Sequence, residues 1–554
     1  MEIGLHPAMP TYSGGLGILA GDTLRAAADM CVPMVAVTLL HRKGYFRQHL
    51  DPQGNQWDSP ATWSPESLLE PLPQRASVTI EGRKVVIRPW RLTVEGVSGG
   101  KLAVYYLDTA VPENTPWDQG LTDHLYGGDN HYRLCQEVLL GIGGIAMLRA
   151  LGYQKFHAYH MNDGHSALLT LALLEERAAG RPLDSLTTED LESVRRECVF
   201  TTHTPLQAGH DQFPLSMAGQ VIGQDRLRIL SVTDCCPHGT LNMTLLAMFL
   251  SHYVNGVALR HRETALTLYP NFPVNSITNG VHAATWIARP LLELYDRHIP
   301  GWRQDNYYLR YAVNIPLDHI LHAHATAKQM LLNEVERRTQ AHFDPFAFTI
   351  GFARRATAYK RHDLFFTDLE RLGRIVERIG PIQVVFGGKA HPRDEEGTTM
   401  IKRVFAAAAA LGSKLKVVYL EEYDMGLASF LVGGVDLWLN NPQKPLEASG
   451  TSGMKAALNG IPSLSILDGW WVEGHVEGVT GWSIGDDVPG PNSREADARA
   501  LYDKLEYVVL PQFYGRPLAY AQVMRSTIAL NGSFFNTHRM LGQYVANAYN
   551  LGRA

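Results

Sequence analysis

The sequence predicts an α/β protein with two doubly wound, Rossmann-like domains that face a cleft. First, 554 residues are more than one compact core usually holds, so at least two domains are expected. Second, the chain is 45% hydrophobic and 19% charged, which is typical of globular proteins. Third, short apolar strands alternate with helical patterns in two stretches, and strands covered on both faces imply parallel sheets. Such folds bind ligands at the carboxyl ends of their strands.

The first stretch is expected to form the N-terminal domain, residues 1–285. Its strand-like runs are Pro33–Leu40, Lys101–Asp108, Lys155–Met161 and Cys198–His203. One helical pattern covers Leu19–Met30, and a second helix is predicted over His165–Arg177 because its apolar residues share one face. The apolar positions of this second helix are Ala167, Leu168, Leu171 and Leu174.

The second stretch is expected to form the C-terminal domain, residues 346–554. Its strand-like runs are Phe346–Phe352, Ile382–Phe386, Leu415–Leu420, Val435–Leu439 and Ile461–Leu467. Helix-like segments rich in histidine and arginine lie between the two stretches, and residues 286–345 are assigned to this helical connection. The last helix of the chain is expected to pack back on the N-terminal domain.

Composition argues against several classes of function. A net charge of −5 removes the broad basic field that nucleic-acid or anionic-membrane binding would favour. The longest apolar run, Val138–Leu151, is interrupted by glycines and by Arg149, so no membrane span is expected. The start of the sequence lacks a basic and apolar leader pattern, and the five cysteines form no CxxC pair. We therefore expect a cytoplasmic protein without a thiolate zinc site.

Three segments contain residues suited to binding anions or reacting with carbonyl groups. The glycines of Ser13–Gly17 precede a helix, so their N–H groups can approach an anion, and a tight turn is the alternative. Arg354–Arg361 places four cations directly after a strand, which favours a phosphate site over a solvated basic turn. In Glu447–Lys455, a loop of small and hydroxyl residues leads to a lysine that can form a Schiff base if it is desolvated. The alternative is a capped helix with Lys455 at the surface.

Histidines cluster in the N-terminal stretch, at His157, His160, His165, His203 and His210. Zinc binding is one alternative, because histidine is a common zinc ligand. The spacings form no H-E-x-x-H helix and no obvious carboxylate completes a ligand set, so no metal site is expected. Most of these histidines are predicted to be hydrogen-bonded at strand ends, and His203 is expected to face a polar ligand.

Taken in order, these segments resemble the α-glucan phosphorylases (glycogen, starch and maltodextrin phosphorylases), in a short bacterial-type form. That family uses pyridoxal phosphate and has the two-domain GT-B glycosyltransferase architecture. The most specific match is the pattern Glu-Ala-Ser-Gly-Thr-x-x-Met-Lys over Glu447–Lys455. Further matching segments are Ser13–Gly17, Asn162-Asp163, Thr202–Thr204, Thr278–Val281, Arg355–Lys360, Gly387–Lys389, Leu420–Tyr423 and Leu458–Gly460. The likeness covers most of the chain.

The resemblance implies a role for each matching residue. Lys455 would form the aldimine with pyridoxal 5′-phosphate. The cofactor would also contact Thr451, Ser452, Gly453, Arg354, Tyr423, Trp286 and Gly14. The substrate phosphate would be bound by Arg355, Lys360 and the backbone of Gly14 and Gly15. The glucosyl unit would be bound by Glu447, Ser449, Gly450 and Asn279, with His203 beside the reacting ring and the acceptor contacted by Asn162, Asp163 and His165.

Several positions depart from residues that are common in the family. Met1 falls at the end of the family's first strand, so a shortened first strand is expected. Ser13, Thr357, Asp424 and the Trp470-Trp471 pair are the other departures. Bulky changes of this kind leave the preferred length of the glucan open.

The implied activity is phosphorolysis of the non-reducing-end glucosyl unit of glycogen, starch or maltodextrin to α-glucose 1-phosphate, with retention. The expected partners are an α-1,4-glucan and inorganic phosphate, without nucleic acid or membrane, and a homodimer is left open. The cofactor phosphate would donate and accept the proton, and the substrate phosphate would serve as acid and nucleophile, so no glycosidase-type carboxylate pair is needed. Two alternatives stay open: a nucleotide-sugar-dependent glucan synthase, which needs no aldimine lysine, and a catalytically degenerate glucan-binding relative.

Overall fold

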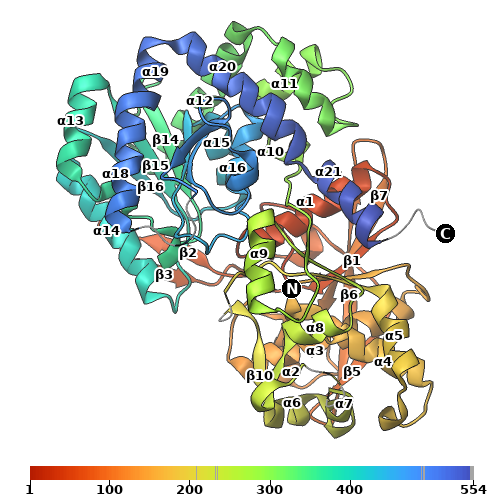
Figure 1. The fold of residues 1–554 in the computed structure, drawn as a ribbon. Helices are drawn as coiled ribbons and strands as arrows, with labels where there is room; N and C mark the ends of the chain where they lie inside the picture. Colours follow the sequence, from red (N-terminus) through yellow and green to blue (C-terminus); the bar gives the residue numbers. More distant parts are fainter. Residues whose placement is uncertain (207–208, 231–232, 234, 488–489, 491–492, 550–554) are drawn as a thin grey trace. The chain divides into compact units, whose positions relative to one another are not determined.

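The computed structural model describes residues 1–206, 209–230, 233, 235–487, 490 and 493–549, and these divide into two compact units (Figure 1). Unit 1 comprises Met1–Phe46, Pro60–Ile277 and the described residues from Leu541 onward. Unit 2 comprises Arg47–Ser59 and Thr278–Met540. In the described part of the chain, no helix has both the length and the apolar composition needed to span a membrane.

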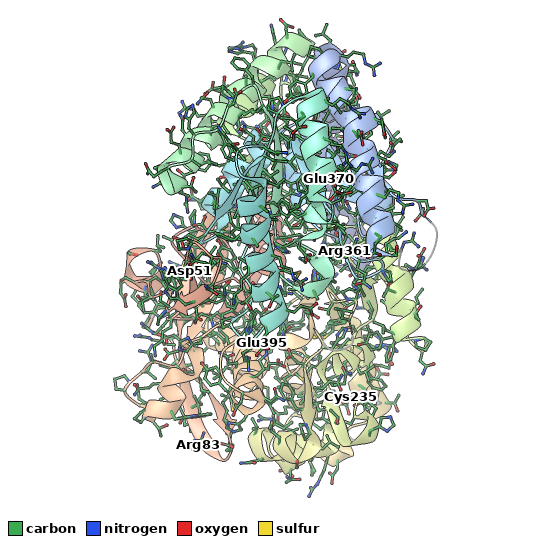
Figure 2. The ribbon with its side chains drawn as sticks, turned by 90° about the vertical axis from the view of Figure 1, so that its left-hand side faces the viewer. Asp51, Arg83, Cys235, Arg361, Glu370 and Glu395 are labelled. Carbon is green, nitrogen blue, oxygen red and sulfur yellow. The ribbon has the colours of Figure 1, made fainter. Side chains whose placement is uncertain are left out.

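Unit 1 contains a mixed sheet of five strands. They are β1 (Val35–Leu39), β7 (Lys101–Asp108), β6 (Arg83–Glu95), β4 (Glu70–Pro71) and β5 (Ala76–Ile80). β1 and β7 pair in parallel, as predicted, but β7 pairs antiparallel with β6, which begins at Arg83 (labelled in Figure 2). The prediction of parallel pairing is therefore wrong for much of this sheet. The search for continuous apolar runs missed β6 because its buried and partly exposed residues alternate over most of its length.

The second sheet of unit 1 is parallel throughout. Its strands, in order, are β13 (Asn275–Ser276), β12 (Tyr253–Gly256), β9 (Cys198–Thr201) and β8 (Tyr159–Asn162). The segment predicted as one helix from His165 divides into a short turn, Gly164–Ser166, and α4 (Leu169–Ala178). Helix α3 (Asn130–Ala150) packs closely on α4, because a Cβ at Gly141 would lie 2.7 Å from the amide nitrogen of Leu169.

Shorter elements complete unit 1. Its other helices are α1 (Gly15–Asp29), α2 (Pro116–Gln119), α5 (Thr188–Glu197), α6 (Leu215–Ile222), α7 (Gln224–Leu230), α8 (Met243–Phe249) and α9 (Leu259–Leu268). A small antiparallel pair joins β10 (Gln212–Pro214) to β11 (Thr240–Asn242). After α21 (Thr537–Gln543), the hydroxyl of Tyr544 lies 3.1 Å from Oγ1 of Thr201 and accepts a hydrogen bond from Asn255 at 3.0 Å. The segment that follows α21 is thereby held on β9 and β12.

Unit 2 is built on a six-stranded parallel sheet. The strands, in spatial order, are β16 (Lys416–Leu420), β15 (Ile382–Gly387), β14 (Phe348–Ala353), β17 (Leu437–Asn440), β18 (Ser463–Ile466) and β19 (Gly481–Ile484). All five predicted strands of this stretch are present, and β19 was not predicted. In chain order the arrangement is third, second, first, fourth, fifth, sixth, which is the order of a doubly wound sheet. The order reverses between β14 and β17, where such sheets bind their ligands.

Helices surround this sheet (Figure 1). They are α10 (Ala283–Trp286), α11 (Arg289–His298), α12 (Leu317–Thr339), α13 (Leu369–Ile379), α14 (Glu395–Leu411), α15 (Met425–Gly434), α16 (Ser452–Leu458), α17 (Trp471–Gly474), α18 (Arg494–Lys504), α19 (Leu510–Gly515) and α20 (Pro517–Thr527). The first three contain most of the region predicted as a helical connection. Lys328 of α12 is buried and donates to Asp436, just before β17, at 2.6 Å, which anchors that region to the sheet.

A hairpin from the N-terminal part of the sequence belongs to unit 2. Its strands are β2 (Arg47–Leu50) and β3 (Gln56–Ser59). The side chain of Gln48 is buried and donates to the carbonyl oxygen of Gly388 at 3.0 Å. The backbone nitrogen of Gln48 also donates to the carboxylate of Glu422 at 2.6 Å. The hairpin therefore supports the loops that follow β15 and β16.

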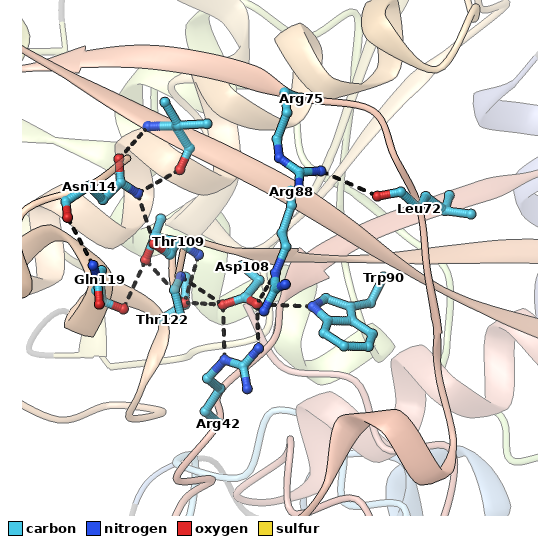
Figure 3. A network of polar contacts seen from close by, with 12 residues as sticks. Arg42, Leu72, Arg75, Arg88, Trp90, Asp108, Thr109, Asn114, Gln119 and Thr122 are labelled. Atoms are coloured by element: carbon cyan, nitrogen blue, oxygen red, sulfur yellow. Dashed lines mark hydrogen bonds and ion pairs between the residues drawn. The ribbon is translucent and has the colours of Figure 1, made fainter. Parts of the chain in front are cut away.

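A charged cluster fastens three segments of unit 1 together (Figure 3). Asp108, the last residue of β7, is fully buried and accepts from Arg42 at 2.6 Å, Arg88 at 2.8 Å and the indole of Trp90 at 3.0 Å. Burial alone would raise the pKa of Asp108, but Arg42 and the indole lower it to about 2. The carboxylate is therefore ionised at neutral pH. It joins the segment that follows β1 to β6 and β7.

Replacing Asp108 with Asn is expected to destabilise unit 1 by ~3–5 kcal/mol at neutral pH, because two guanidinium groups lose their buried counter-ion. A carboxyl with a lowered native pKa stabilises the fold above its unfolded pKa of ~3.9 and loses that contribution as the pH falls toward 2. Calorimetry of both proteins from pH 7 to pH 2 measures the difference. A gap in melting temperature that stays constant down to pH 2 would contradict the assignment.

Candidate active site

The candidate site of unit 2 begins where the strand order reverses. Arg354 directly follows β14, and Glu447 lies in the loop that follows β17. Both side chains are buried, and Nη2 of Arg354 donates to the carboxylate of Glu447. Within the described residues, Nε and Nη1 of Arg354 have no hydrogen-bond partner. Because buried donors are rarely left unpaired, these two atoms are candidates for binding an anionic or polar ligand.

Lys360 adds a second cation to this pair. It ends a short turn, Ala358–Lys360, and is half-buried. Burial and the neighbouring Arg354 lower the pKa of Lys360 to about 7, against the opposing attraction of Glu447. Burial alone would raise the pKa of Glu447, but Arg354 and Lys360 lower it, so this carboxylate is ionised. The three groups form one charged cluster, which excludes a solvated basic turn.

Arg355 and Arg361 take different positions from their neighbours. Arg355 is exposed and lines an open cavity of about 530 Å³ together with Thr357, His391, Arg393, Asp394 and Glu395, the last labelled in Figure 2. Arg361 is buried and ion-paired with Asp497 at 2.8 Å, so it does not serve as the fourth phosphate-binding cation that the sequence suggested. Its guanidinium already has protein acceptors.

Lys455 lies in the interior of unit 2. It is only 7% exposed, and its Nζ lies 3.7 Å from the centre of the Trp286 ring. Asn459 holds both residues, because its side-chain nitrogen donates to the carbonyl oxygens of Trp286 at 2.9 Å and Lys455 at 3.0 Å. The side chain of Thr451, at the start of α16, forms no capping hydrogen bond. The alternative of a capped helix with a surface lysine is therefore wrong.

Two positions of this loop favour glycine, one because of close packing and the other because of its backbone conformation. A Cβ at Gly453 would lie 2.9 Å from the indole of Trp470, and Gly450 has a φ of +76°, which favours glycine. Trp470 and Trp471 are almost fully buried and Trp470 packs against Phe535, so this pair, which departs from the family pattern, belongs to the core beside the loop. Tyr423 is half-buried and lies against Gly387, where a Cβ would be 3.2 Å from its ring.

Two further residues of the predicted glucosyl site have buried polar atoms. Oγ of Ser449 and Oδ1 of Asn279 have no hydrogen-bond partner among the described residues. The carbonyl oxygen of Asn279 accepts from Arg539 at 2.8 Å, which fixes its backbone. Both side chains can therefore take a hydroxyl-bearing ligand.

Unit 1 brings a second group of predicted residues together. The ring of His203, after β9, is hydrogen-bonded to Oδ1 of Asn162 at the end of β8. Burial, with smaller contributions from His261 and His160, lowers the pKa of His203 to about 3, so the ring is neutral at pH 7. Asp163, with a φ of +67°, caps the turn that carries His165 and has a pKa raised by burial.

Sequence reasoning missed three partners of His165. Its Nδ1 lies 2.9 Å from Asp211 and 3.0 Å from Arg133, and Glu137 is beside them. The expectation that no carboxylate completes a set with these histidines is therefore wrong, since α3 supplies Glu137 and the segment just before β10 supplies Asp211. Arg133 donates to Glu137 at 3.1 Å and to Asp211 at 2.9 Å, so both carboxyl groups already have a cationic partner. Only the spacing of Arg133 and Glu137 on one helix face could have suggested this pairing.

The glycine loop before α1 already has an anionic partner. The backbone nitrogens of Ser13 and Gly14 donate to the carboxylate of Glu2 at 2.6 Å and 3.3 Å. The hydroxyl of Tyr126 donates to the same carboxylate at 2.9 Å. The loop therefore binds a carboxylate in the manner expected of an anion site, while Gly15 begins α1.

The chain is similar to named carbohydrate phosphorylases over its whole length. A model of the carbohydrate phosphorylase family matches residues 210–478. The maltodextrin phosphorylase of Thermococcus litoralis is 39% identical and aligns with 100% of this chain and 70% of its own length. The chain belongs to the carbohydrate phosphorylase family. The glycogen phosphorylase of Aquifex aeolicus is 35% identical over 99% of this chain and 85% of its own length, and that of Mycobacterium tuberculosis is 37% identical over 99% and 70%.

The lowered pKa of Lys360 predicts that, without bound anions, its amine loses its proton near neutral pH. Its acetylation rate, followed by mass spectrometry, should rise with pH through a midpoint of about 7. Inorganic phosphate should move that midpoint upward, because an anion stabilises the ammonium form. Glu447→Gln should lower the midpoint and Arg354→Gln should raise it. A wild-type midpoint near that of an ordinary lysine, ~10, would show that Lys360 is not held in the charged cluster.

Proposed function

We propose that the chain is an α-1,4-glucan phosphorylase. It would transfer the non-reducing-end glucosyl unit of glycogen or maltodextrin to inorganic phosphate and release α-glucose 1-phosphate with retention. The observation that carries the proposal is the buried Arg354, which is paired with Glu447 and has two further nitrogens without a partner among the described residues. The names of the relatives, maltodextrin and glycogen phosphorylase, supply the substrate class.

The residues of unit 2 fit pyridoxal 5′-phosphate. Lys455, buried against Trp286, would hold the cofactor through its ε-amine, and the unpartnered nitrogens of Arg354 suit a phosphate ester. The backbone N–H of Gly453, in the first turn of α16, would add a neutral donor. The remaining contacts would come from Thr451, Ser452, Tyr423 and Gly14. When bound, the cofactor would supply a phosphate group that donates and accepts a proton.

Two cations would bind the substrate phosphate, and they differ in burial. Lys360, with a pKa of about 7, can gain a full charge when the anion arrives, and Arg355, which is exposed and lines a cavity, would be the second cation. The amides of Gly14 and Gly15 would add neutral donors, with Gly14 exchanging the carboxylate of Glu2 for phosphate. These charges offset the repulsion between two phosphate groups at close range. The bound phosphate can then act as acid and nucleophile.

The glucosyl unit would be oriented by hydrogen bonds from Glu447, Ser449, Gly450 and Asn279. The unpartnered oxygens of Ser449 and Asn279 suit sugar hydroxyls, and the ionised Glu447 is a strong acceptor. Because His203 is neutral at pH 7, it would bind the ring through hydrogen bonding rather than charge. Asn162, Asp163 and His165 would contact the acceptor side. In this proposal the chain has the two Rossmann-like domains of the GT-B architecture.

Phosphate-dependent release of glucose 1-phosphate from maltodextrins of graded length tests the activity directly. Product should form with inorganic phosphate and maltodextrin and should be absent when phosphate is omitted. The purified protein should show the absorbance of bound pyridoxal phosphate, and Lys455→Ala should lose both this absorbance and turnover. A colourless protein that the cofactor cannot activate, or turnover that requires a nucleotide sugar, would overturn the proposal.

Arg355→Ala is expected to lower kcat by at least ~100-fold, the scale for losing one electrostatic stabiliser of a transition state. Arg393→Ala is the matched control, because Arg393 lines the same cavity and has no assigned contact with the phosphate. Steady-state kinetics with saturating maltodextrin measure both variants. Near-wild-type kcat in Arg355→Ala, or an equal loss in the control, would show that the substrate phosphate binds elsewhere.

A further inference from the structure

Arg361 joins the two loops that enclose the reversal point of the unit 2 sheet. Its Nε donates to the carbonyl oxygen of Asn441 at 2.9 Å, and its Nη2 donates to that of Pro442 at 2.8 Å. In return, the side-chain nitrogen of Asn441 donates to the carbonyl oxygen of Arg361 at 2.8 Å. We call this set of contacts the Arg361 strap. It connects the loop after β14 with the loop after β17.

The strap is buried, and the positive charge of Arg361 is paired with a carboxylate. Arg361, labelled in Figure 2, is only 7% exposed, and its remaining nitrogen, Nη1, lies 2.8 Å from the carboxylate of Asp497 in α18. All three guanidinium nitrogens therefore have an acceptor within unit 2. A lysine could not replace this arrangement, since one ammonium cannot reach two adjacent carbonyl oxygens and a carboxylate with the same planar geometry.

The backbone of Arg361 adopts a conformation that side chains rarely take. Its φ is +50° and its ψ is +55°, in the left-handed region, at the end of the turn that carries Lys360. Such conformations cost free energy and persist where surrounding contacts hold them, often at functional sites. Here the side-chain contacts of the strap supply that constraint.

The strap lies directly beside the residues that would bind the substrate. Lys360 precedes Arg361 in the chain, and the backbone nitrogen of Gln443 donates to the carbonyl oxygen of Tyr359 at 2.7 Å. The ring of His362 lies 3.1 Å from the carbonyl oxygen of Arg354, which secures the other end of the same loop. Four residues after Gln443, the second loop reaches Glu447. Movement of either loop would therefore separate Lys360 from the Arg354–Glu447 pair.

We propose that Arg361 is a positioning residue for phosphate binding: by joining the loops after β14 and β17, it fixes Lys360 beside the Arg354–Glu447 pair. This inference rests on the proposed function for the identity of the anion. It assigns Arg361 and Asp497 a role through Lys360, and neither residue touches the substrate.

The test measures phosphate affinity without requiring turnover. Inorganic phosphate is titrated calorimetrically into the cofactor-loaded protein in the absence of glucan. Arg361→Lys is expected to raise the Kd for phosphate by at least ~10-fold, because a displaced Lys360 loses its geometry. Asp497→Asn, which keeps the contacts to both carbonyl oxygens, is expected to raise it by a smaller factor. This second variant carries the test if Arg361→Lys does not fold.

Arg403→Gln is the matched control. Arg403 pairs with Asp363 at 2.9 Å, two residues beyond Arg361, and within the described residues it has no hydrogen bond or ion pair with the strap. Its phosphate affinity should stay within about twofold of wild type. Hydrogen exchange should show faster exchange at residues 357–362 and 441–446 in Arg361→Lys only, since those amides lie in the joined loops.

Each result decides one question. Unchanged phosphate affinity in Arg361→Lys, despite faster exchange in both loops, would reduce the strap to a structural role and overturn the inference. An equal loss of affinity in Arg403→Gln would also overturn it. A wild-type protein whose phosphate affinity depends on this strap but which releases no glucose 1-phosphate from maltodextrin would refute the proposed function alone.

Discussion

The buried ion pair between Arg354 and Glu447 is the contact on which the candidate site of unit 2 depends. Taking two charges out of water costs several kcal/mol each, and only their mutual attraction and good geometry offset that cost. Removing either partner would leave the other as an uncompensated buried charge. The loops after β14 and β17 must therefore keep their relative position, which also defines where Lys360 lies. Among the described residues, Nε and Nη1 of Arg354 have no hydrogen-bond partner beside this pair.

The parallel sheet explains why residues far apart in sequence meet there. β14 and β17 pair directly, so the segments that leave their carboxyl ends begin side by side. The basic segment after β14 uses its four cations differently. Arg354 is paired with a carboxylate, Lys360 has a lowered pKa, Arg355 is exposed and Arg361 holds backbone carbonyl groups. Similar side chains thus acquire different chemistry from their burial and partners alone.

Unit 1 contributes histidines whose charge is set by burial. His203 is neutral because desolvation penalises the imidazolium form, and the nearby ring of His165 is shared between a guanidinium and a carboxylate. Arg133 of α3 pairs with Glu137 on the same helix and with Asp211, just before β10, and it contacts the ring of His165. These contacts make the polar end of β8 and β9 a fixed surface for hydrogen bonding.

The sequence by itself determined the α/β class, most strands of the unit 2 sheet and, through the Glu447–Lys455 motif, membership in the phosphorylase family. Apolar runs and ordered motifs are local properties, so they can be recognised without knowing what they touch. Only the tertiary structure decided that Lys455 is buried against Trp286, that Arg361 anchors loops instead of binding phosphate, and that Glu137 and Asp211 meet His165. It also revealed that β6 is antiparallel to β7 and that the β2–β3 hairpin belongs to unit 2. Burial, ion pairing and strand direction arise from contacts between distant parts of the chain, and no local spacing encodes them.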